Sequence, residues 1–306
     1  MTEPRENERD ESRAERLPVR KTYKLYIGGE FPRSESGRSY PVNDERGGLL
    51  AWAVRASKKD LREAVRAARS AWPGWSEKTA YNRGQVLYRV AELMEGRRAQ
   101  FVDEVALAGA RDPDREVEAA IDRWVWYAGW SDKVHHVLGT VNPVAAPYFN
   151  FTIPESMGVV GIVAPEEAPL LGLVSRLAPA IVSGNAAVLL ASERWPLPAV
   201  TLTEVLATSD VPGGVVNVLT GLKAELIPWL AGHMDVNAVD LTGVPQHLRY
   251  EVEQLGAENV KRLVGAKSGK DGDGSDGLDF FSERAQSPYD ITALMEMKTV
   301  WHPMGA

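Results

Sequence analysis

Two adjacent glutamates, Glu166 and Glu167, stand between two prolines in the string APEEAPL, residues 164–170. Paired carboxylates can serve as a general acid and a general base when their surroundings push their pKa values apart. The sequence on both sides is apolar, with MGVVGIVAP leading into the pair and LLGLVSRLAPAIVSGNAAVLL following it. This context predicts that the pair lies at the end of a buried strand. It leaves two interpretations open: a catalytic acid pair, or a site that once carried another chemistry.

Few other side chains have the spacing of a reactive site. There is no cysteine, which excludes disulfides, thiolate metal sites and a cysteine nucleophile. His135 and His136 end a tryptophan-rich segment without an ordered Ser/His/Asp arrangement, so we interpret them as surface or capping residues. The string DGDGSDG resembles a calcium loop, but Asp276 stands where that loop needs glycine and Ser282 where it needs a bidentate acid. The sequence therefore predicts no metal site.

The composition of the 306-residue chain is that of a soluble globular protein, with 44% hydrophobic and 25% charged residues. The length suits one large or two small domains. A formal net charge of -7 argues against nucleic acid or an anionic membrane as the main partner. No apolar run approaches the roughly 20 residues that span a bilayer, and the N-terminus lacks the apolar core of a signal peptide. We therefore expect a cytoplasmic protein.

The first half of the chain predicts a charged tail followed by a hairpin and several helices. Residues 1–21 hold six acidic and six basic residues, which predicts a disordered tail because so polar a segment cannot bury a core. Alternating apolar residues around a Gly-Gly pair predict a β-hairpin. Ser57 is a candidate helix N-cap. Apolar periodicity then predicts helices over residues 57–75, 82–110 and 115–136, the last rich in tryptophan that we interpret as packing.

The second half changes to the period of a strand and then alternates strands with helices. From residue 148 apolar and polar residues alternate, so Phe149, Phe151 and Ile153 share one strand face. After Gly158, strand and helix signals alternate up to Val264. This order predicts an α/β fold with a doubly wound, mostly parallel sheet.

The C-terminal part contains two further predicted segments. Residues 265–288 are rich in Gly, Asp and Ser, which predicts a flexible linker. Residues 289–306 end in an alternating pattern that predicts a terminal strand, with one set of alternate residues at Met295, Met297, Thr299 and Trp301 and the other at Glu296, Lys298, Val300 and His302.

The chain resembles the NAD(P)-dependent aldehyde dehydrogenase superfamily in a series of strings that occur in the same order: YIGGEF, AVRAARSAWPGW, YAGWSDK, GVVGIVAP, LAPAIVSGNAAVLL, VPGGVVNVLTG and LTG. The resemblance implies that residues 22–264 form the family's Rossmann-like NAD-binding domain, with an arm hairpin at about residues 137–157. The closing MEMKTVWHP resembles the family's C-terminal oligomerisation strand, within residues 289–306. Where the family has its catalytic domain, this sequence has only the linker of residues 265–288.

The resemblance implies that the glutamate pair is not an acid/base device. The matching family segment reads Pro-Trp-Asn-Phe-Pro, and its asparagine donates a hydrogen bond to the oxyanion of a thiohemiacetal. Glu167 stands at the position of that asparagine, and an ionised carboxylate cannot donate. The family's cysteine nucleophile has no counterpart, and GAKSG stands in place of the Glu-Leu-Gly-Gly motif that carries the family's general base. We therefore expect no catalytic residue and a protein that is not an enzyme on its own.

The resemblance also implies a degenerate cofactor site. Three positions that contact the cofactor in the family have changed: Leu190 replaces a lysine, Val244 a serine and Leu248 a glycine. The matching residues that persist, and that we predict as a vestigial cofactor site, are Pro165, Ser192, Glu193, Gly221, Thr242 and Gly243. An alternative is that the turns and the sheet need these residues. We expect no cofactor, or weak binding of NAD(P).

Three functions are compatible with the sequence. The favoured one is a structural or regulatory subunit in a hetero-oligomer with a full-length aldehyde dehydrogenase, because in the family the arm and the C-terminal strand pack on a neighbouring subunit. The candidate contact residues are Phe149, Phe151, Ile153, Val300 and Trp301. The alternatives are an NAD(P)-binding sensor and an oxidoreductase that acts on aldehydes with another nucleophile.

Overall fold

A five-stranded parallel sheet lies at the centre of the protein, whose computed structural model describes residues 19–265 and 278–305. The strands run in the order β10-β9-β6-β7-β8, and every neighbouring pair is parallel. Their bounds are β6 (Val159–Val163), β7 (Ala186–Leu190), β8 (Val216–Leu219), β9 (Ala238–Asp240) and β10 (Arg262–Val264). β6 and β7 are buried on both faces, which is why their sequences are continuously apolar. The predicted doubly wound sheet is confirmed.

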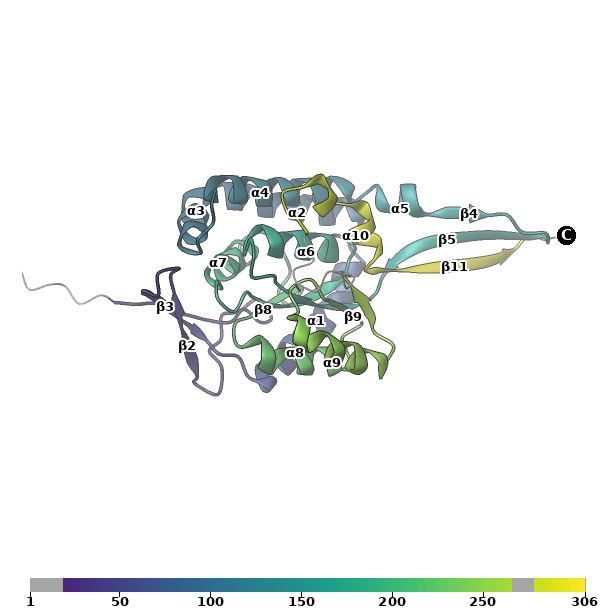
Figure 1. The fold of residues 1–306 in the computed structure, drawn as a ribbon. Coiled ribbons are helices and arrows are strands. Elements are labelled where there is room, and N and C mark those ends of the chain that lie inside the picture. The colour runs from purple at the N-terminus through teal and green to yellow at the C-terminus, as the bar shows by residue number, and fades with distance from the viewer. Residues whose placement is uncertain (1–18, 266–277, 306) are drawn as a thin grey trace, which may run out of the picture.

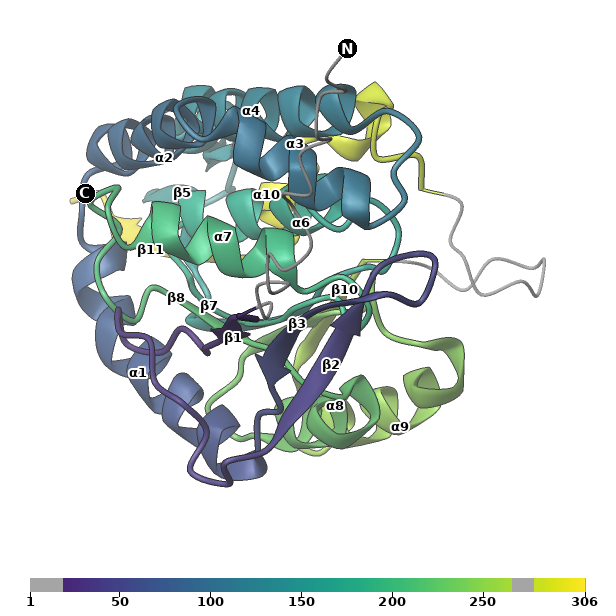
Figure 2. The same cartoon turned by 90° about the vertical axis from the view of Figure 1, so that its left-hand side faces the viewer.

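Helices cover both faces of this sheet (Figures 1 and 2). One face carries α1 (Lys58–Ser76), α8 (Lys223–Gly232) and α9 (Gln246–Ala257). The other carries α6 (Leu171–Val182) and α7 (Leu197–Leu206), with α2 (Ala80–Glu95), α3 (Arg98–Leu107) and α4 (Pro113–Trp130) outside them. Because alternate strand residues point to opposite faces, Val160 and Val159 belong to two separate apolar clusters, one on each side of the sheet.

The predicted helices are present, although the predicted helix over residues 115–136 is interrupted after Trp130 and continues as a short separate helix. Ser57 caps α1 and forms a capping box with Asp60. The predicted segment 82–110 divides into α2 and α3. Trp124 and Tyr127 of α4 are fully buried, which confirms the packing interpretation. His135 and His136 lie exposed in α5 (Val134–Leu138), as expected for surface residues.

The predicted N-terminal hairpin is only partly correct. The Gly-Gly turn is present, because Gly28 and Gly29 have φ values of +66° and +90° and Ile27 pairs with Glu30 across them. The hydrogen bond from Leu25 N to Pro32 O extends this short hairpin by one step, and Tyr26 also pairs with Val218 at the edge of the main sheet. A separate small sheet lies on the side of the protein that faces the viewer in Figure 2. Its strands run in the order β1-β3-β2, with β1 (Thr22–Tyr23), β2 (Ser39–Asn43) and β3 (Leu49–Val54).

A three-stranded antiparallel arm projects from the body of the protein (Figure 1). Its strands, in the order β11-β5-β4, are β4 (Thr140–Asn142), β5 (Tyr148–Ser156) and β11 (Met295–Pro303). The predicted arm hairpin (β4 and β5) and the predicted terminal strand (β11) therefore form one sheet. The side chain of Arg262 in β10 donates to Met295 O and to the Glu296 carboxylate, which fixes the base of β11 beside the main sheet.

The prediction of a flexible linker over residues 265–288 is wrong for residues 278–288. Residues 278–288 pack on the body, with a 3-10 turn at Glu283–Ala285, and lead into α10 (Pro288–Thr292). The buried guanidinium of Arg123 donates to Phe280 O at 2.8 Å and to Ala285 O at 2.5 Å. The Phe280 side chain is itself buried. Apolar anchors inside a polar stretch, together with a buried arginine that needs carbonyl acceptors, explain why composition alone gave the wrong result.

The predicted disordered tail and the first part of the predicted linker fall largely on residues 1–18 and 266–277, which lie outside the described residues. In the part of the chain that the structure describes, no helix has the length and apolar character needed to cross a bilayer.

Candidate functional site

The strand order places a crevice at the carboxyl end of the sheet. Along the chain, β7 and β8 add on one side of β6 and β9 and β10 on the other, so the order reverses between β6 and β9. Ligands of doubly wound sheets bind beside such a reversal, at the carboxyl ends of the strands. A crevice of about 450 Å³ lies there, lined by Pro165, Glu166, Glu167, Glu193, Arg194, Lys223, Ala224, Thr242, Gly243, Val244, Pro245, His247 and Leu248. Both glutamates of the APEEAPL string therefore line it.

Glu166 is bound on all sides by donors from other segments. Its carboxylate accepts hydrogen bonds from Ser192 Oγ at 2.5 Å, Glu193 N at 3.0 Å and Arg194 N at 3.2 Å. It also forms an ion pair with the ammonium group of Lys223. Burial alone would raise the pKa of Glu166, but the charge of Lys223 and these hydrogen bonds outweigh it and hold the pKa below its usual value. Glu166 is therefore a charged, fully paired group and not a proton donor.

Lys223 is the cation at the bottom of the crevice. It is the first residue of α8, only 4% of its surface is exposed, and its Nζ donates to Ala164 O at 2.7 Å and to Gly243 O at 3.3 Å. Ala164 follows β6 and Gly243 follows β9, so the ammonium group joins the two loops on either side of the reversal. With Glu166 as the third acceptor, all three ammonium hydrogens have partners.

Glu193 completes the network from the other side. Its carboxylate accepts the backbone N–H of Lys223 at 2.8 Å, which caps the start of α8. Its own backbone N–H donates to Glu166. The turn after β7 and the N-terminus of α8 thus offer their N–H groups to carboxylates of the chain itself.

Glu167 does not share this environment. Its side chain is exposed at the rim of the crevice, whereas Glu166 is mostly buried in the network. The interpretation of the two residues as a catalytic acid pair is therefore not supported by their geometry.

The glycines predicted as cofactor residues have structural reasons to be glycine. A Cβ on Gly243 would collide with Ala164 O, so the loops after β6 and β9 can approach only if this residue has no side chain. Gly221 has a φ of +153° and lies against the backbone of Ala56. Ser192 donates to Glu166 in the wall of the crevice. The contacts of these residues match the alternative that the turns and the sheet need them.

The replaced positions Leu190, Val244 and Leu248 are all buried in the apolar cluster between the sheet and α8 and α9. Val244 and Leu248 also line the crevice. Their side chains give this part of the wall an apolar character.

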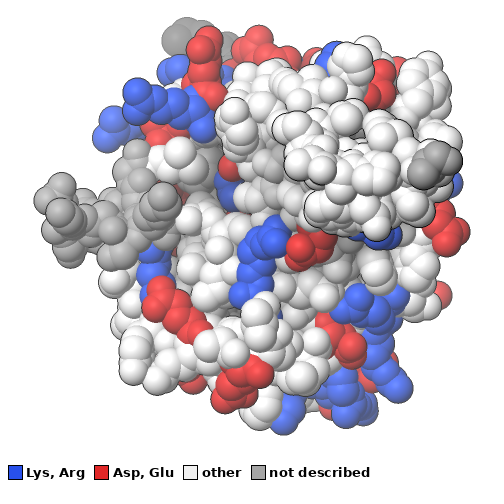
Figure 3. All heavy atoms as spheres, turned by 90° about the vertical axis from the view of Figure 1, so that its right-hand side faces the viewer, with Lys and Arg blue, Asp and Glu red and all other residues white. Residues whose placement is uncertain are grey.

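The arm separates the five residues predicted to contact a partner. Directly opposite residues of antiparallel strands point to the same side, so the pairing of Val300 with Phe151 places Val300 with Phe149, Phe151 and Ile153 on one face. Trp301 pairs with Asn150 and therefore lies on the other face, where its ring contacts Tyr148. In the view of Figure 3, the tip of the arm is covered mostly by uncharged residues.

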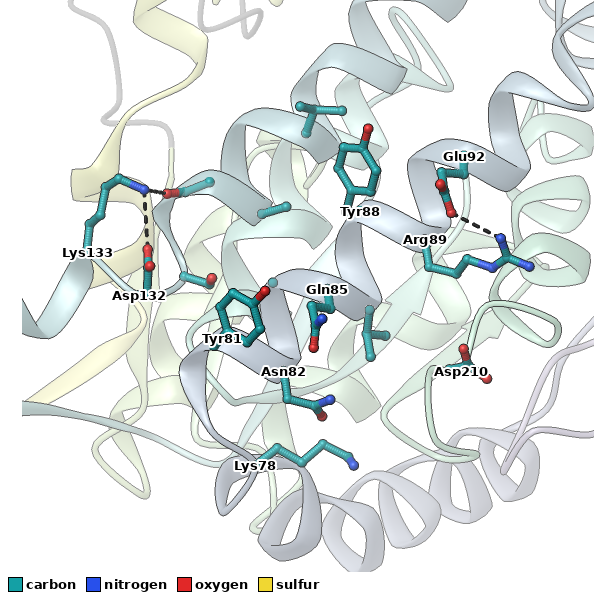
Figure 4. Close-up of a pocket in the computed structure, with 16 residues that line it drawn as sticks. Lys78, Tyr81, Asn82, Gln85, Tyr88, Arg89, Glu92, Asp132, Lys133 and Asp210 are labelled. Atoms are coloured by element: carbon teal, nitrogen blue, oxygen red, sulfur yellow. Dashed lines mark hydrogen bonds and ion pairs between the residues drawn. The ribbon is translucent and has the colours of Figure 1, made fainter.

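A larger groove of about 830 Å³ lies elsewhere, between α2 and α4 (Figure 4). Four of the charged side chains drawn there form ion pairs on the surface, Arg89 with Glu92 at 3.0 Å and Lys133 with Asp132 at 3.3 Å. Tyr81 and Tyr88 of α2 are exposed along it. No group of three or more His, Cys, Asp or Glu residues within 19–265 and 278–305 could hold a metal ion. We find no convergent chemistry in this groove.

Sequence reasoning missed Lys223. A signal was available, because a lysine at the first position of a helix opposes the helix dipole and calls for a nearby carboxylate. Its partner, however, lies far away along the chain, and only the fold brings the two together.

Comparisons with known proteins agree with the resemblance. The family model described as "Aldehyde dehydrogenase family" matches residues 32–272. Retinal dehydrogenase 2 of Homo sapiens is 32% identical over 255 residues, which cover 81% of this chain and 49% of that protein.

Solved structures give the same result. The structure of HpcC from Thermus thermophilus matches with a TM-score of 0.77 and 31% identity, covering 82% of this chain and 49% of that one. The NAD+ complex of an aldehyde dehydrogenase from Bacillus cereus matches with a TM-score of 0.74 and 26% identity, covering 80% and 50%. The chain thus spans about half the length of these relatives.

Proposed function

The chain belongs to the aldehyde dehydrogenase family, and we propose that it is a non-catalytic member that serves as a structural or regulatory subunit of a hetero-oligomer with a full-length aldehyde dehydrogenase. The observation that carries the proposal is the arm, a projecting sheet that leaves the apolar side chains of Val141, Phe149 and Trp301 exposed. In this role the chain contributes contacts, and its partner contributes the chemistry.

The residues expected of a catalyst support the non-catalytic part of the proposal. The sequence has no cysteine to form a thiohemiacetal. Glu167, at the position that resembles the family's oxyanion donor, is an exposed carboxylate at the rim of the crevice. An ionised carboxylate there would repel a developing oxyanion instead of stabilising it.

The crevice also fits a dinucleotide poorly. Phosphate groups bind to free backbone N–H groups and to cations at helix N-termini. Here Glu166 accepts the N–H groups of Glu193 and Arg194 together with the charge of Lys223, and Glu193 accepts the first N–H of α8. A pyrophosphate placed at these groups would meet two carboxylates, and each of these donors is already engaged.

The arm supports the subunit part of the proposal. Its apolar face carries Phe149, Phe151, Ile153 and Val300, and Phe149 is 43% exposed. β11 is an edge strand, with β5 on one side and no strand of the described residues on the other. An apolar face next to an open edge favours aggregation or the addition of a partner's strand. The catalytic domain of a full-length relative is the partner that we propose.

Purification of the untagged chain from its own cells tests this function. We expect a full-length aldehyde dehydrogenase to copurify with it, and a variant that ends at residue 295 to lose that partner, because this variant lacks nearly all of β11 but keeps the buried residues Ile291, Leu294 and Met295. Circular dichroism of the shortened chain checks that the sheet domain is still folded. An intact chain that remains a soluble monomer or homodimer beside every full-length dehydrogenase of its cell would refute the proposal.

The two other functions have their own readouts. Aldehyde oxidation by the pure chain would support an oxidoreductase with a different nucleophile. Tight binding of NAD(P) in a calorimeter would support a sensor. We expect neither, because the chain has no cysteine and because the donors around Glu166 are already engaged within the chain.

A further inference from the structure

The donors around Glu166 converge as they would around a bound anion. The hydroxyl of Ser192, the N–H groups of Glu193 and Arg194, and the ammonium group of Lys223 all point at one carboxylate. Two consecutive backbone N–H groups, a hydroxyl and a lysine are a typical set for holding a phosphate or carboxylate ligand. The anion that they hold belongs to the chain.

The network leaves these donors little freedom to accept another ligand. Lys223 is buried and also donates to Ala164 O and Gly243 O, so moving it would break contacts to the loops after both β6 and β9. Ser192 is 1% exposed, and its Oγ also accepts the N–H of Trp195 at 2.9 Å. An incoming anion would have to displace Glu166 while facing the second carboxylate of Glu193.

We propose that Glu166 is an internal ligand: its carboxylate occupies the anion-binding position of the crevice, closes it to dinucleotides and other phosphate compounds, and makes the fold independent of a bound cofactor. This inference rests on the proposed function in one respect, that the crevice no longer serves catalysis. It assigns to Glu166 a role that the subunit proposal does not require.

An ordinary stabilising ion pair predicts a different behaviour from an internal ligand. If Glu166 only neutralised the charge of Lys223, its removal would weaken the fold, and the chloride of the buffer would compensate as well as acetate or diphosphate does. If Glu166 fills an anion site, its removal exposes that site, and a small free anion can take its place. Chemical rescue by anions therefore separates the two cases.

The test compares the thermal unfolding of the full chain and of Glu166→Ala in chloride buffer, with and without millimolar acetate or inorganic diphosphate. We expect Glu166→Ala to lose roughly 5 °C in Tm and to regain most of that loss when either anion is added at constant ionic strength. The parent chain should show no shift with acetate, diphosphate or NAD+. A folded Glu166→Ala chain that ignores both anions would show that Glu166 is only an ion-pair partner and overturn the proposal.

Glu155→Ala is the matched control. Glu155 is also a carboxylate paired with a lysine, Lys298 at 3.0 Å, but both side chains are exposed on the arm and no backbone N–H joins the pair. We expect little change in its Tm and no effect of the anions beyond that on the parent. Equal rescue of Glu155→Ala would reveal a general salt effect and count against the internal ligand.

A measurement on the parent chain covers the case in which Glu166→Ala does not fold. Hydrogen exchange followed by mass spectrometry reports the protection of the Glu193 and Arg194 amides in the peptide that contains them. We expect this protection to be unchanged by millimolar NAD+ or diphosphate, because Glu166 stays in place. A ligand-dependent gain in protection there would mean that the crevice still accepts phosphates, which contradicts the proposal.

These outcomes are separable from those of the proposed function. Rescue of Glu166→Ala by anions, in a chain that copurifies with no dehydrogenase, would remove the subunit role and leave the internal ligand. Copurification of a dehydrogenase with the chain, without rescue of Glu166→Ala by anions, would leave the subunit role and remove the internal ligand.

Discussion

The crevice and the arm of this protein differ in whether their binding groups already have partners within the chain. In the crevice, the carboxylates of Glu166 and Glu193 and the ammonium group of Lys223 all find partners within the chain. On the arm, large apolar side chains are left in contact with solvent, with Val141 68% and Trp301 58% exposed. A ligand would add few new hydrogen bonds or ion pairs in the crevice, whereas a partner would remove exposed apolar surface of the arm from water. We therefore infer that this protein binds its partner through the arm and not through the crevice.

The largest expected effect comes from a charge on the apolar face of the arm. Phe151→Glu places a carboxylate among Phe149, Ile153 and Val300, where docking would have to desolvate it. We expect the affinity for the full-length partner to fall by at least about 100-fold, which corresponds to roughly 3 kcal/mol. Surface plasmon resonance with the immobilised partner measures this loss.

Tyr88→Glu is the control for that substitution. Tyr88 is an aromatic residue of α2 with 52% of its surface exposed, well outside the arm. Its replacement should leave the affinity unchanged. If the two variants weaken binding equally, the contact does not lie on the arm and the comparison fails.

The next effect concerns how the arm is held to the body. Arg123→Met removes the buried guanidinium that binds Phe280 O, Ala285 O and Ser175, and so releases the segment that leads into β11. Leaving buried carbonyl groups without donors should reduce the free energy of unfolding by about 3 kcal/mol. Urea denaturation measures this loss, and the control Arg111→Met, at an exposed arginine, should stay within about 0.5 kcal/mol of the parent. A stable Arg123→Met variant would mean that the segment is held by its apolar residues alone.

A smaller effect contrasts Glu166 with another buried carboxylate, Glu104. Glu104 accepts a hydrogen bond from Thr201 at 2.7 Å, but its Oε2 has no partner among the described residues and no cation pairs with it as Lys223 pairs with Glu166. Burial raises the pKa of Glu104 to about 7 despite the hydrogen bonds from Thr201 and Gln100. The folded state therefore holds this proton more tightly than the unfolded state does.

The stability contributed by Glu104 should be complete below its ordinary pKa of 4.5 and be lost as the pH rises through about 7. Glu104→Gln should match the parent at low pH and exceed it by about 2 kcal/mol at about pH 8. The sign is reversed for Glu166, whose lowered pKa stabilises the fold above its ordinary value and loses that contribution as the pH falls. Unfolding free energies of both Gln variants across pH measure this, and parallel pH profiles would contradict the distinction.

The sequence predicts the sheet and its helices well because their signals are local. Continuous apolar runs predict buried strands such as β6, and apolar periodicity with an N-cap predicts α1. The network around Glu166 could not be predicted in the same way, since its carboxylate, its backbone donors and its cation follow three different strands. The segment after residue 277 was misjudged because a few buried contacts, Phe280 and the carbonyl partners of Arg123, outweigh its polar composition. Composition and periodicity do not predict contacts between distant parts of the chain.

Native mass spectrometry of the untagged chain, purified from its own cells and supplied with NAD+, tests most directly the inference that binding uses the arm and not the crevice. The account predicts a hetero-oligomer with a full-length aldehyde dehydrogenase in which the number of bound dinucleotides equals the number of full-length subunits. Loss of the complex in Phe151→Glu would attribute the assembly to the arm. A monomer or homodimer of this chain, or one dinucleotide bound to every subunit of the assembly, would contradict it.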